Sequence, residues 1–236
     1  MSINVDSNAY TLGFATIIVV GVALLLSGFS ELVKERYKQN VILDKKMSIM
    51  SSVDKNATKE NTEQKFNSTI KSLIVNSKGE SQEVDPLKSL DIDLRKELKK
   101  PLENRSLPLY VYTDNGKTKY ILPMHGNGLW DFIGGYLAIK PDFNTLAGAL
   151  FTHVGETPGL GAEMTKDWFQ DNFIDEKLMK DGEFIGIKVL KGKGNKANAE
   201  LHKVDGMSGA TITGDGIEAM IETCVKGYLP YFKKNK

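Results

Sequence analysis

The sequence predicts a mixed α+β domain that follows a single N-terminal transmembrane helix. Three observations predict this arrangement. An uncharged, apolar stretch lies near the N-terminus, and short β-like runs surround an Asn-Gly turn in the middle of the chain. Further strands and helices follow without a regular βα alternation, which favours α+β over a doubly wound fold. With 236 residues, the chain has room for one domain of ordinary size plus an appendage.

The membrane segment is the clearest element. No charged residue lies between Asp6 and Glu31, and Leu12–Phe29 is apolar apart from a threonine and a serine. A helix needs about 20 such residues to cross a bilayer, so we assign a short tail to 1–10 and a transmembrane helix to 11–30. The alternatives are a cleaved signal peptide and a buried soluble helix. A signal peptide needs basic residues before the apolar run, and the first ten residues contain none.

The orientation of this helix stays open from the residues alone. Basic residues follow the helix and none precedes it: Lys34, Arg36, Lys38, Lys45 and Lys46. Charge counting would therefore place the large domain in the cytoplasm, but the rule is weak for long translocated domains.

Residues 31–100 are polar and charged, and we expect a helical stalk followed by a linker region. Apolar residues recur near helical spacing at the start, at Val33, Tyr37, Val41, Met47 and Met50. A second helix is expected over Lys59–Leu73. Glycine and proline punctuate the remainder, at Gly79, Pro86 and Pro101.

Residues 101–236 are expected to form the α+β domain. The hairpin signal Asn115-Gly116 lies between two β-like runs, because both residues tolerate the positive φ of a type I′ turn. Further strands are expected over 136–140, 145–154 and 183–190. A final amphipathic helix is expected over Asp215–Tyr228.

Several functions are disfavoured by composition and spacing. The 31 basic and 30 acidic residues give no global positive field for nucleic acid. Cys224 has no cysteine partner for a disulfide, and the isolated histidines offer no metal-ligand spacing. The segment 206–210 lacks the glycine spacing of a serine-hydrolase elbow, and 186–194 lacks that of a nucleotide P-loop.

The segment 205–214 combines small residues with clustered hydroxyls just before a predicted helix. The hydroxyls belong to Ser208, Thr211 and Thr213. A helix N-terminus presents free N–H groups and a partial positive charge, which favour a phosphate. The simpler alternative is that Ser208 or Thr213 only caps the helix.

Two other glycine-rich segments are candidates for ligand contact. The segment 153–163 forms a tight loop after a strand, where backbone amides can approach a planar ligand. The segment 125–132 places Trp130 between glycines and an aspartate, as a stacking wall or as a core residue.

The sequence DGMSGAT, residues 205–211, resembles the flavinylation motif of FMN-binding domains, whose final threonine carries FMN through a phosphoester. ETPGLGAE (156–163), GNGLWD (126–131) and FNTLAG (143–148) stand in the order and spacing seen in the NqrC family of the sodium-translocating NADH:quinone oxidoreductases. The related RnfG proteins of Rnf complexes share the acceptor motif and the anchor, and are the alternative.

This resemblance implies covalent FMN on Thr211. Asp205 fills the acidic position that the Mg²⁺-dependent flavin transferase requires, and the Mg²⁺ belongs to that enzyme. Small residues let the acceptor loop enter the transferase (Ser208, Gly209 and Ala210). Thr213 lies outside the acceptor pattern and is expected to cap the helix or bond the phosphate. The flavin ring is expected against Trp130 and the loop made of Glu156, Thr157, Pro158, Gly159, Leu160 and Gly161.

The implied protein is a membrane-anchored electron carrier in a sodium-translocating NADH:quinone oxidoreductase complex of the bacterial inner membrane. Its FMN domain is expected on the periplasmic side, because a large domain can override loop charges. The expected partners are the other subunits of the complex and, transiently, the flavin transferase, with no nucleic acid and no resident metal. A non-redox tethered adaptor and an isolated hydrolase acting through Ser208 remain the alternatives from other classes.

Overall fold

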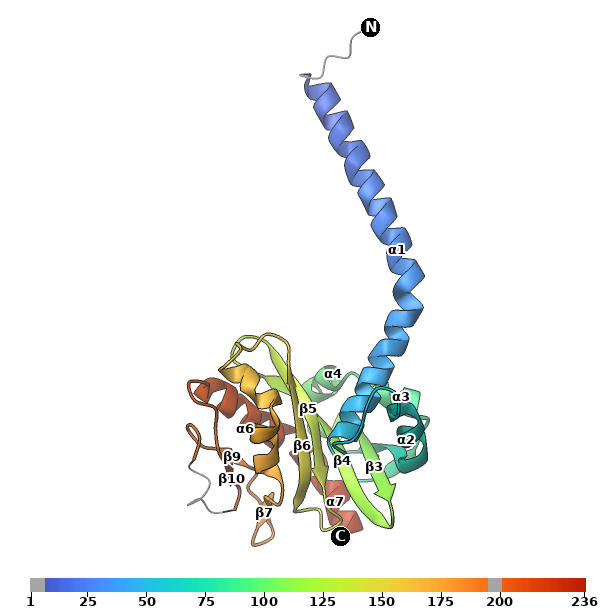
Figure 1. Cartoon of the computed structure of the whole chain (residues 1–236). Helices are drawn as coiled ribbons and strands as arrows, with labels where there is room; N and C mark the ends of the chain where they lie inside the picture. The colour runs from blue at the N-terminus through green and yellow to red at the C-terminus, as the bar shows by residue number, and fades with distance from the viewer. Residues whose placement is uncertain (1–6, 195–200) are drawn as a thin grey trace. The chain divides into compact units, whose positions relative to one another are not determined.

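The computed structural model describes residues 7–194 and 201–236, which form two units divided between Leu43 and Asp44. The first unit is the greater part of helix α1, Asn8–Ser51 (Figure 1). Its apolar stretch is long enough to cross a membrane by length and composition, and none of that stretch is buried. The second unit is a mixed α+β domain around an antiparallel sheet, so the predicted fold class is confirmed.

The main sheet of the second unit has six strands in the order β2-β1-β3-β4-β5-β6. Its strands are β1 Ile70–Asn76, β2 Ser81–Glu83, β3 Ser106–Asp114, β4 Lys117–Asn127, β5 Phe132–Ile139 and β6 Leu146–His153. The hairpin between β3 and β4 turns at Asn115 and Gly116, with φ of 48° and 73°, as the sequence predicted. Every pairing in this sheet is antiparallel, and the paired strands follow one another closely in the chain except β1 and β3, which residues 77–105 separate.

The helix expected over residues 59–73 is shorter than predicted. Helix α2 runs Thr62–Thr69, and the chain then becomes strand β1, which pairs with β3 along its whole length. Its apolar residues Ile70 and Val75 are buried, on opposite faces of the sheet. The polar segment after residue 43 therefore supplies part of the second unit, including helices α3 Pro86–Leu90, α4 Leu94–Lys99 and η1 Leu102–Asn104.

The C-terminal third contains short elements before two helices. They are η2 Gly161–Thr165, α5 Asp167–Gln170, η3 Asp171–Phe173, β7 Met179–Lys180, β8 Glu183–Phe184, β9 Lys188–Val189 and β10 Lys203–Val204. The strand expected over 183–190 is split into β8 and β9, because Gly186 has a φ of 72° that ends the extended run. Helix α6 runs Thr211–Lys226 and α7 runs Leu229–Asn235.

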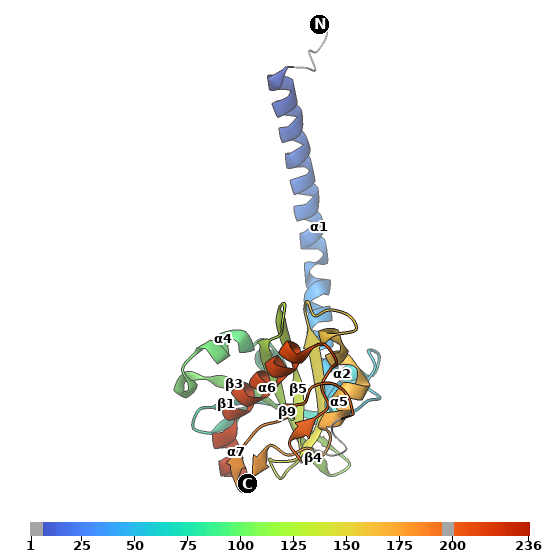
Figure 2. The same ribbon diagram turned by 90° about the vertical axis from the view of Figure 1, so that its left-hand side faces the viewer.

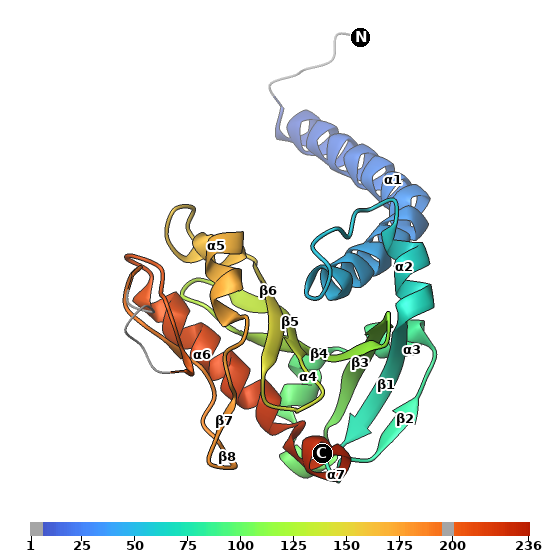
Figure 3. The ribbon, with the colours of Figure 1, turned by 60° about the horizontal axis from the view of Figure 1, so that its bottom comes forward.

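The sheet buries residues on both of its faces. Helices α6 and α7 pack on one face of the sheet (Figures 2 and 3). The side chains of Leu109, Leu122 and Ile217 belong to the main core. On the other face, the ring of Phe66 in α2 meets that of Tyr110 in β3, with centroids 6.5 Å apart. The alternation of Leu109 and Tyr110 follows from the two-residue period of a strand.

Helix α6 is fixed at its C-terminal end by Tyr228. This side chain is fully buried, and its hydroxyl donates a 2.7 Å hydrogen bond to the carbonyl of Pro108 in β3. The helix begins four residues before the predicted Asp215, so the predicted acceptor threonine lies within its first turn.

Candidate functional site

The three glycine-rich segments predicted from the sequence meet at one buried carboxylate. Glu156 is 5% exposed, although it lies in the loop after β6. Its Oε1 accepts hydrogen bonds from the N–H groups of Leu129, at 2.7 Å, and Trp130, at 3.3 Å. Its Oε2 accepts a 2.7 Å bond from the hydroxyl of Thr213 in α6. One side chain therefore holds the 126–131 segment, the 156–163 segment and the start of α6 together. We call these three hydrogen bonds the Glu156 clamp.

Two glycines make room for the Glu156 clamp. A Cβ on Gly128 would fall inside van der Waals contact with Oε1 of Glu156, and one on Gly161 would do the same with Oε2. The Gly161 Cβ would also lie 2.6 Å from Oγ1 of Thr213. These glycines are required by close approach rather than by a left-handed backbone.

The loop after Glu156 is compact and touches residues 205–211, the predicted acceptor segment. The N–H of Leu160 donates to the carbonyl of Thr157 at 3.1 Å, and Gly159 has a φ of 78°. A Cβ on Gly209 would lie 2.9 Å from Cδ2 of Leu160, so the two segments pack directly. Gly209 itself has a φ of 75°, which an L side chain rarely adopts.

Thr211 is the first residue of α6 and its side chain is exposed. The N-cap residue is Ala210, which forms no side-chain cap, and the first turn of α6 carries no acidic residue. The first N–H groups of a helix have no acceptor within the helix, and the dipole is positive there. A phosphate on the Thr211 hydroxyl would therefore lie beside groups that favour an anion.

Thr213 is placed differently from the expectation that it caps the helix or bonds a phosphate. Its side chain is fully buried and its hydroxyl donates to Glu156. The reason is its position two residues after Thr211, which turns it towards the protein interior. Of the two threonines, only Thr211 offers its hydroxyl to solvent.

The remaining residues of the acceptor segment are held by the chain that follows β9. The N–H of Gly206 donates to the carbonyl of Gly192 at 2.9 Å, and the N–H of Gly194 donates to Oδ2 of Asp205 at 2.9 Å. Ser208 is exposed. From the sequence, 186–194 was considered only as a nucleotide P-loop, which its spacing disfavours, and this contact was not predicted; the closely spaced glycines 192 and 194 were the available signal.

Exposed apolar side chains lie on or next to the three segments that the Glu156 clamp joins. Trp130 is 70% exposed and Ile212 58%, and the others are Leu129, Val154 and Leu160. Trp130 is therefore an exposed side chain and not the core residue that its type more often becomes. Thr157 and Pro158 are also exposed.

These residues fit FMN on the chemistry they present. An exposed hydroxyl at a helix start suits a phosphate, and exposed aromatic and aliphatic side chains from the adjoining loops suit a planar apolar ring. Residues 128–226 match the family model described as FMN-binding domain. The fold and the site thus define a flavoprotein domain of this class.

Comparison with whole chains identifies similar proteins within this class. The NqrC protein of the Na(+)-translocating NADH-quinone reductase from Vibrio campbellii is 29% identical over 256 residues, covering 99% of this chain and 97% of that protein. The crystal structure of the corresponding protein from Parabacteroides distasonis matches with a TM-score of 0.75 and 34% identity, over 85% of this chain and 96% of that chain. Shewanella oneidensis NqrC matches with a TM-score of 0.69 and 27% identity, over 82% and 97%.

The chain belongs to the NqrC family of the Na⁺-translocating NADH-quinone reductases. Of the two families that the motifs left open, the comparisons show this one.

Proposed function

We propose that this protein carries FMN covalently on Thr211, through a phosphoester, and relays electrons within a Na⁺-translocating NADH:quinone oxidoreductase complex. The observation that carries the proposal is the contrast between two neighbouring hydroxyls. Thr211 is exposed at the start of α6, whereas Thr213 is buried and bonded to Glu156. FMN supplies one- and two-electron chemistry when bound, and the protein supplies its position and surroundings.

A covalent bond suits a carrier whose ring must stay accessible to redox partners. A tethered group remains at high effective concentration near its contacts, so the protein does not need to enclose it. The side chains of Trp130, Thr157 and Leu160 are exposed and supply an open wall for the ring. Glu156 acts as a positioning residue, because its hydrogen bonds fix the loops that carry Trp130 and Leu160 relative to α6.

The acceptor segment also suits recognition by a modifying enzyme. Ser208, Gly209 and Ala210 have small side chains, and the first two are exposed. A flavin transferase could therefore approach the Thr211 hydroxyl with little steric hindrance. Asp205 is the acidic residue that we assign to recognition by the transferase and its Mg²⁺.

The test of the covalent bond compares three proteins co-expressed with a flavin transferase. The wild-type chain should give a fluorescent flavin band on a denaturing gel and gain the mass of FMN minus water. Thr211→Ala should give neither. Ser208→Ala is the matched control, since it removes an exposed hydroxyl three residues away and should keep both signals. A colourless wild-type product, or a band that survives in Thr211→Ala, would contradict the proposal.

The place of the protein in the cell follows from the anchor. We propose that α1 spans the bacterial inner membrane and that the FMN domain is periplasmic, with the other subunits of the complex as partners. Cys224 cannot report on the side, because it is buried and its burial raises the pKa of the thiol to about 11. An exposed cysteine introduced as Asn67→Cys, in a Cys224→Ala background, should react with an impermeant maleimide in intact spheroplasts. Labelling only after lysis would place the domain in the cytoplasm.

A further inference from the structure

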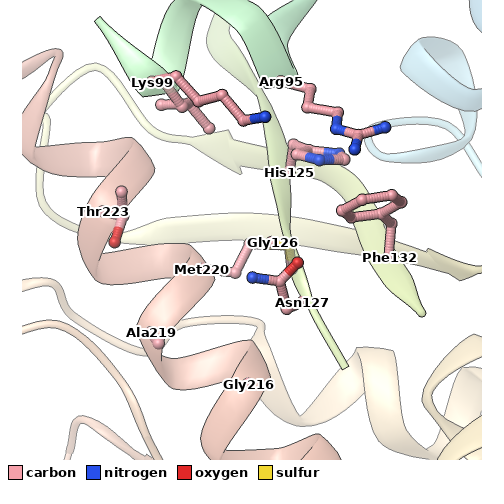
Figure 4. Close-up of a pocket in the computed structure, with 11 residues that line it drawn as sticks. Arg95, Lys99, His125, Gly126, Asn127, Phe132, Gly216, Ala219, Met220 and Thr223 are labelled. Atoms are coloured by element: carbon pink, nitrogen blue, oxygen red, sulfur yellow. The ribbon is translucent and has the colours of Figure 1, made fainter. Parts of the chain in front are cut away.

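A cavity lies between helix α4, strands β4 and β5, and helix α6, and Thr211 is not among its lining residues. Its volume is about 480 Å³, within the range of about 300–1,000 Å³ that small-molecule sites occupy. Gly126 and Asn127 belong to the 126–131 segment that the Glu156 clamp holds, but none of the lining residues belongs to 205–214 or to 156–163. Figure 4 shows Arg95 and Lys99 entering from α4, opposite residues of α6.

Two cationic side chains of the short helix α4 line this cavity. Arg95 and Lys99 are four residues apart in α4, a spacing that places them on the same helix face. Within the ranges that the structure describes, neither forms an ion pair, whereas Lys96 and Lys100 of the same segment are paired with Asp93 and Glu97. The cations on the other sides of α4 are thus neutralised locally, and those at the cavity are not.

The guanidinium of Arg95 is held by an aromatic ring. Its Cζ lies 4.1 Å from the centroid of Phe132, whose ring is 5.0 Å from that of His125. A planar guanidinium that lies over a ring keeps its N–H groups at its edge. Two of these groups can donate parallel hydrogen bonds to two oxygens of one phosphate. The contact with Phe132 therefore keeps the guanidinium at the β5 side of the cavity.

The other polar groups of the cavity are neutral hydrogen-bonding groups. They are the amide of Asn127, the hydroxyl of Thr223 and the imidazole of His125. Burial and the neighbouring Arg95 lower the pKa of His125, so its ring is uncharged at neutral pH. The carboxylate of Asp93 acts in the opposite direction and raises the pKa of His125, but by less. This carboxylate forms a 3.4 Å ion pair with the ammonium of Lys96. The cavity therefore presents two positive charges with neutral donors.

The wall formed by α6 leaves room for a compact ligand. It contributes Gly216, Ala219, Met220 and Thr223, which include two of the smallest side chains. A Cβ on Gly216 would fall inside van der Waals contact with the carbonyl of Asn127, so the helix packs tightly on β4 beside the opening.

We propose that this cavity binds a phosphomonoester, with Arg95 and Lys99 neutralising its two negative charges and Asn127 and Thr223 bonding its oxygens. A phosphomonoester carries nearly two negative charges at neutral pH and three terminal oxygens, which matches the charges and donors of the cavity. The group could belong to a soluble metabolite or to the headgroup of a phospholipid. The site does not depend on the bond to FMN.

The experiment measures ligand binding to the full chain in a non-ionic detergent by titration calorimetry. The soluble probe is glycerol 3-phosphate, and the lipid probe is phosphatidic acid added to the micelles, with phosphatidylcholine as its control. We expect saturable binding of at least one probe. Glycerol 3-phosphate binding assigns a soluble source, and binding of phosphatidic acid alone assigns a lipid headgroup.

Variants test the residues that carry the proposal. Arg95→Gln and Lys99→Gln should each weaken binding about 10- to 100-fold, since each removes a hydrogen bond to a charged group. Lys96→Gln removes the same charge from the other side of α4 and should change affinity less than about twofold. Arg95→Lys should recover part of the affinity, which a general effect on folding would not explain. Thermal unfolding of each variant identifies any that has lost its fold.

Three outcomes would overturn the proposal. The first is the absence of saturable binding by either probe. The second is binding that Arg95→Gln and Lys96→Gln weaken equally, which indicates general charge attraction. The third is binding that disappears in Thr211→Ala, which would assign the phosphate to the acceptor site. Because Thr211→Ala is also the test of flavin attachment, failure of one proposal remains distinguishable from failure of the other.

Discussion

Removing the carboxylate of Glu156 should loosen the site and destabilise the domain. In Glu156→Ala, the buried hydroxyl of Thr213 and the N–H groups of Leu129 and Trp130 lose their acceptor. Each hydrogen bond to a charged group contributes about 1.5–3 kcal/mol, and an unsatisfied buried group costs about 1–3 kcal/mol. Leu129 and Trp130 are exposed residues, so water can replace part of their loss. We therefore expect a total of about 2–4 kcal/mol, most of it at Thr213.

The assay is thermal unfolding followed by circular dichroism, on the full chain in detergent. For a domain of this size, 1 kcal/mol shifts Tm by about 2–4 °C, so Glu156→Ala should lower Tm by about 4–16 °C. Glu156→Gln keeps the shape and one carbonyl oxygen, and should cost about 1 kcal/mol. A double-mutant cycle of Glu156→Gln with Thr213→Val should show a coupling energy of about 0.5–3 kcal/mol, as contacting residues do.

Two results would refute this reasoning. A Tm of Glu156→Ala within about 1 °C of the wild type would mean that the carboxylate does not hold the three segments. Additive losses in the cycle would mean that the bond between Glu156 and Thr213 contributes nothing of its own. If the clamp also positions the ring, flavinylated Glu156→Gln should show a shifted flavin absorption band, whereas the Tyr228→Phe variant described next should not.

The other predictions test packing, hydrogen bonding and charge elsewhere in the domain. Gly161→Ala should destabilise by about 1–3 kcal/mol because its Cβ would overlap Glu156, whereas Gly155→Ala, whose nearest neighbour would lie 3.5 Å away, should be nearly neutral in the same unfolding assay. Tyr228→Phe should cost about 1–2 kcal/mol in urea unfolding, since it leaves the buried Pro108 carbonyl without its donor; a loss below about 0.3 kcal/mol would contradict this. The pKa of His125 is lower in the folded protein than its ordinary value of 6.5, so the unfolded state binds the proton more readily. Stability should therefore decline as pH falls below about 6.5, and His125→Gln should reduce that slope in unfolding curves measured between about pH 7 and pH 5.

The sequence predicted those parts of the fold that depend on local pattern. There were three such local signals: the uncharged run before Glu31, the turn at Asn115 and Gly116, and the amphipathic face of the helix that corresponds to α6. Strand β1 was missed because its pairing with β3, 30 or more residues later in the chain, decides that this stretch is a strand. No local pattern in residues 59–73 shows that the helix ends at Thr69 and that a strand begins at Ile70.

The candidate site likewise contains parts that the sequence predicted and parts that it did not. The acceptor segment and the loop after β6 were found from their own residues, because small and hydroxyl side chains mark them directly. The role of Glu156 as the acceptor of three hydrogen bonds was not predicted, since its partners lie 26, 27 and 57 residues away. Likewise Thr213 was expected at the helix cap, and only the starting register of α6 shows that it points inwards.

The exposure of Thr211 has a consequence for the flavin attachment proposed above. The large apolar side chains of the main core pack on one another, and Thr211 is exposed outside that core. The polypeptide should therefore reach its final shape while still colourless. The attachment proposed above would then be a late step on an already folded surface, and a cell short of riboflavin should accumulate folded, unpigmented protein rather than degraded chains.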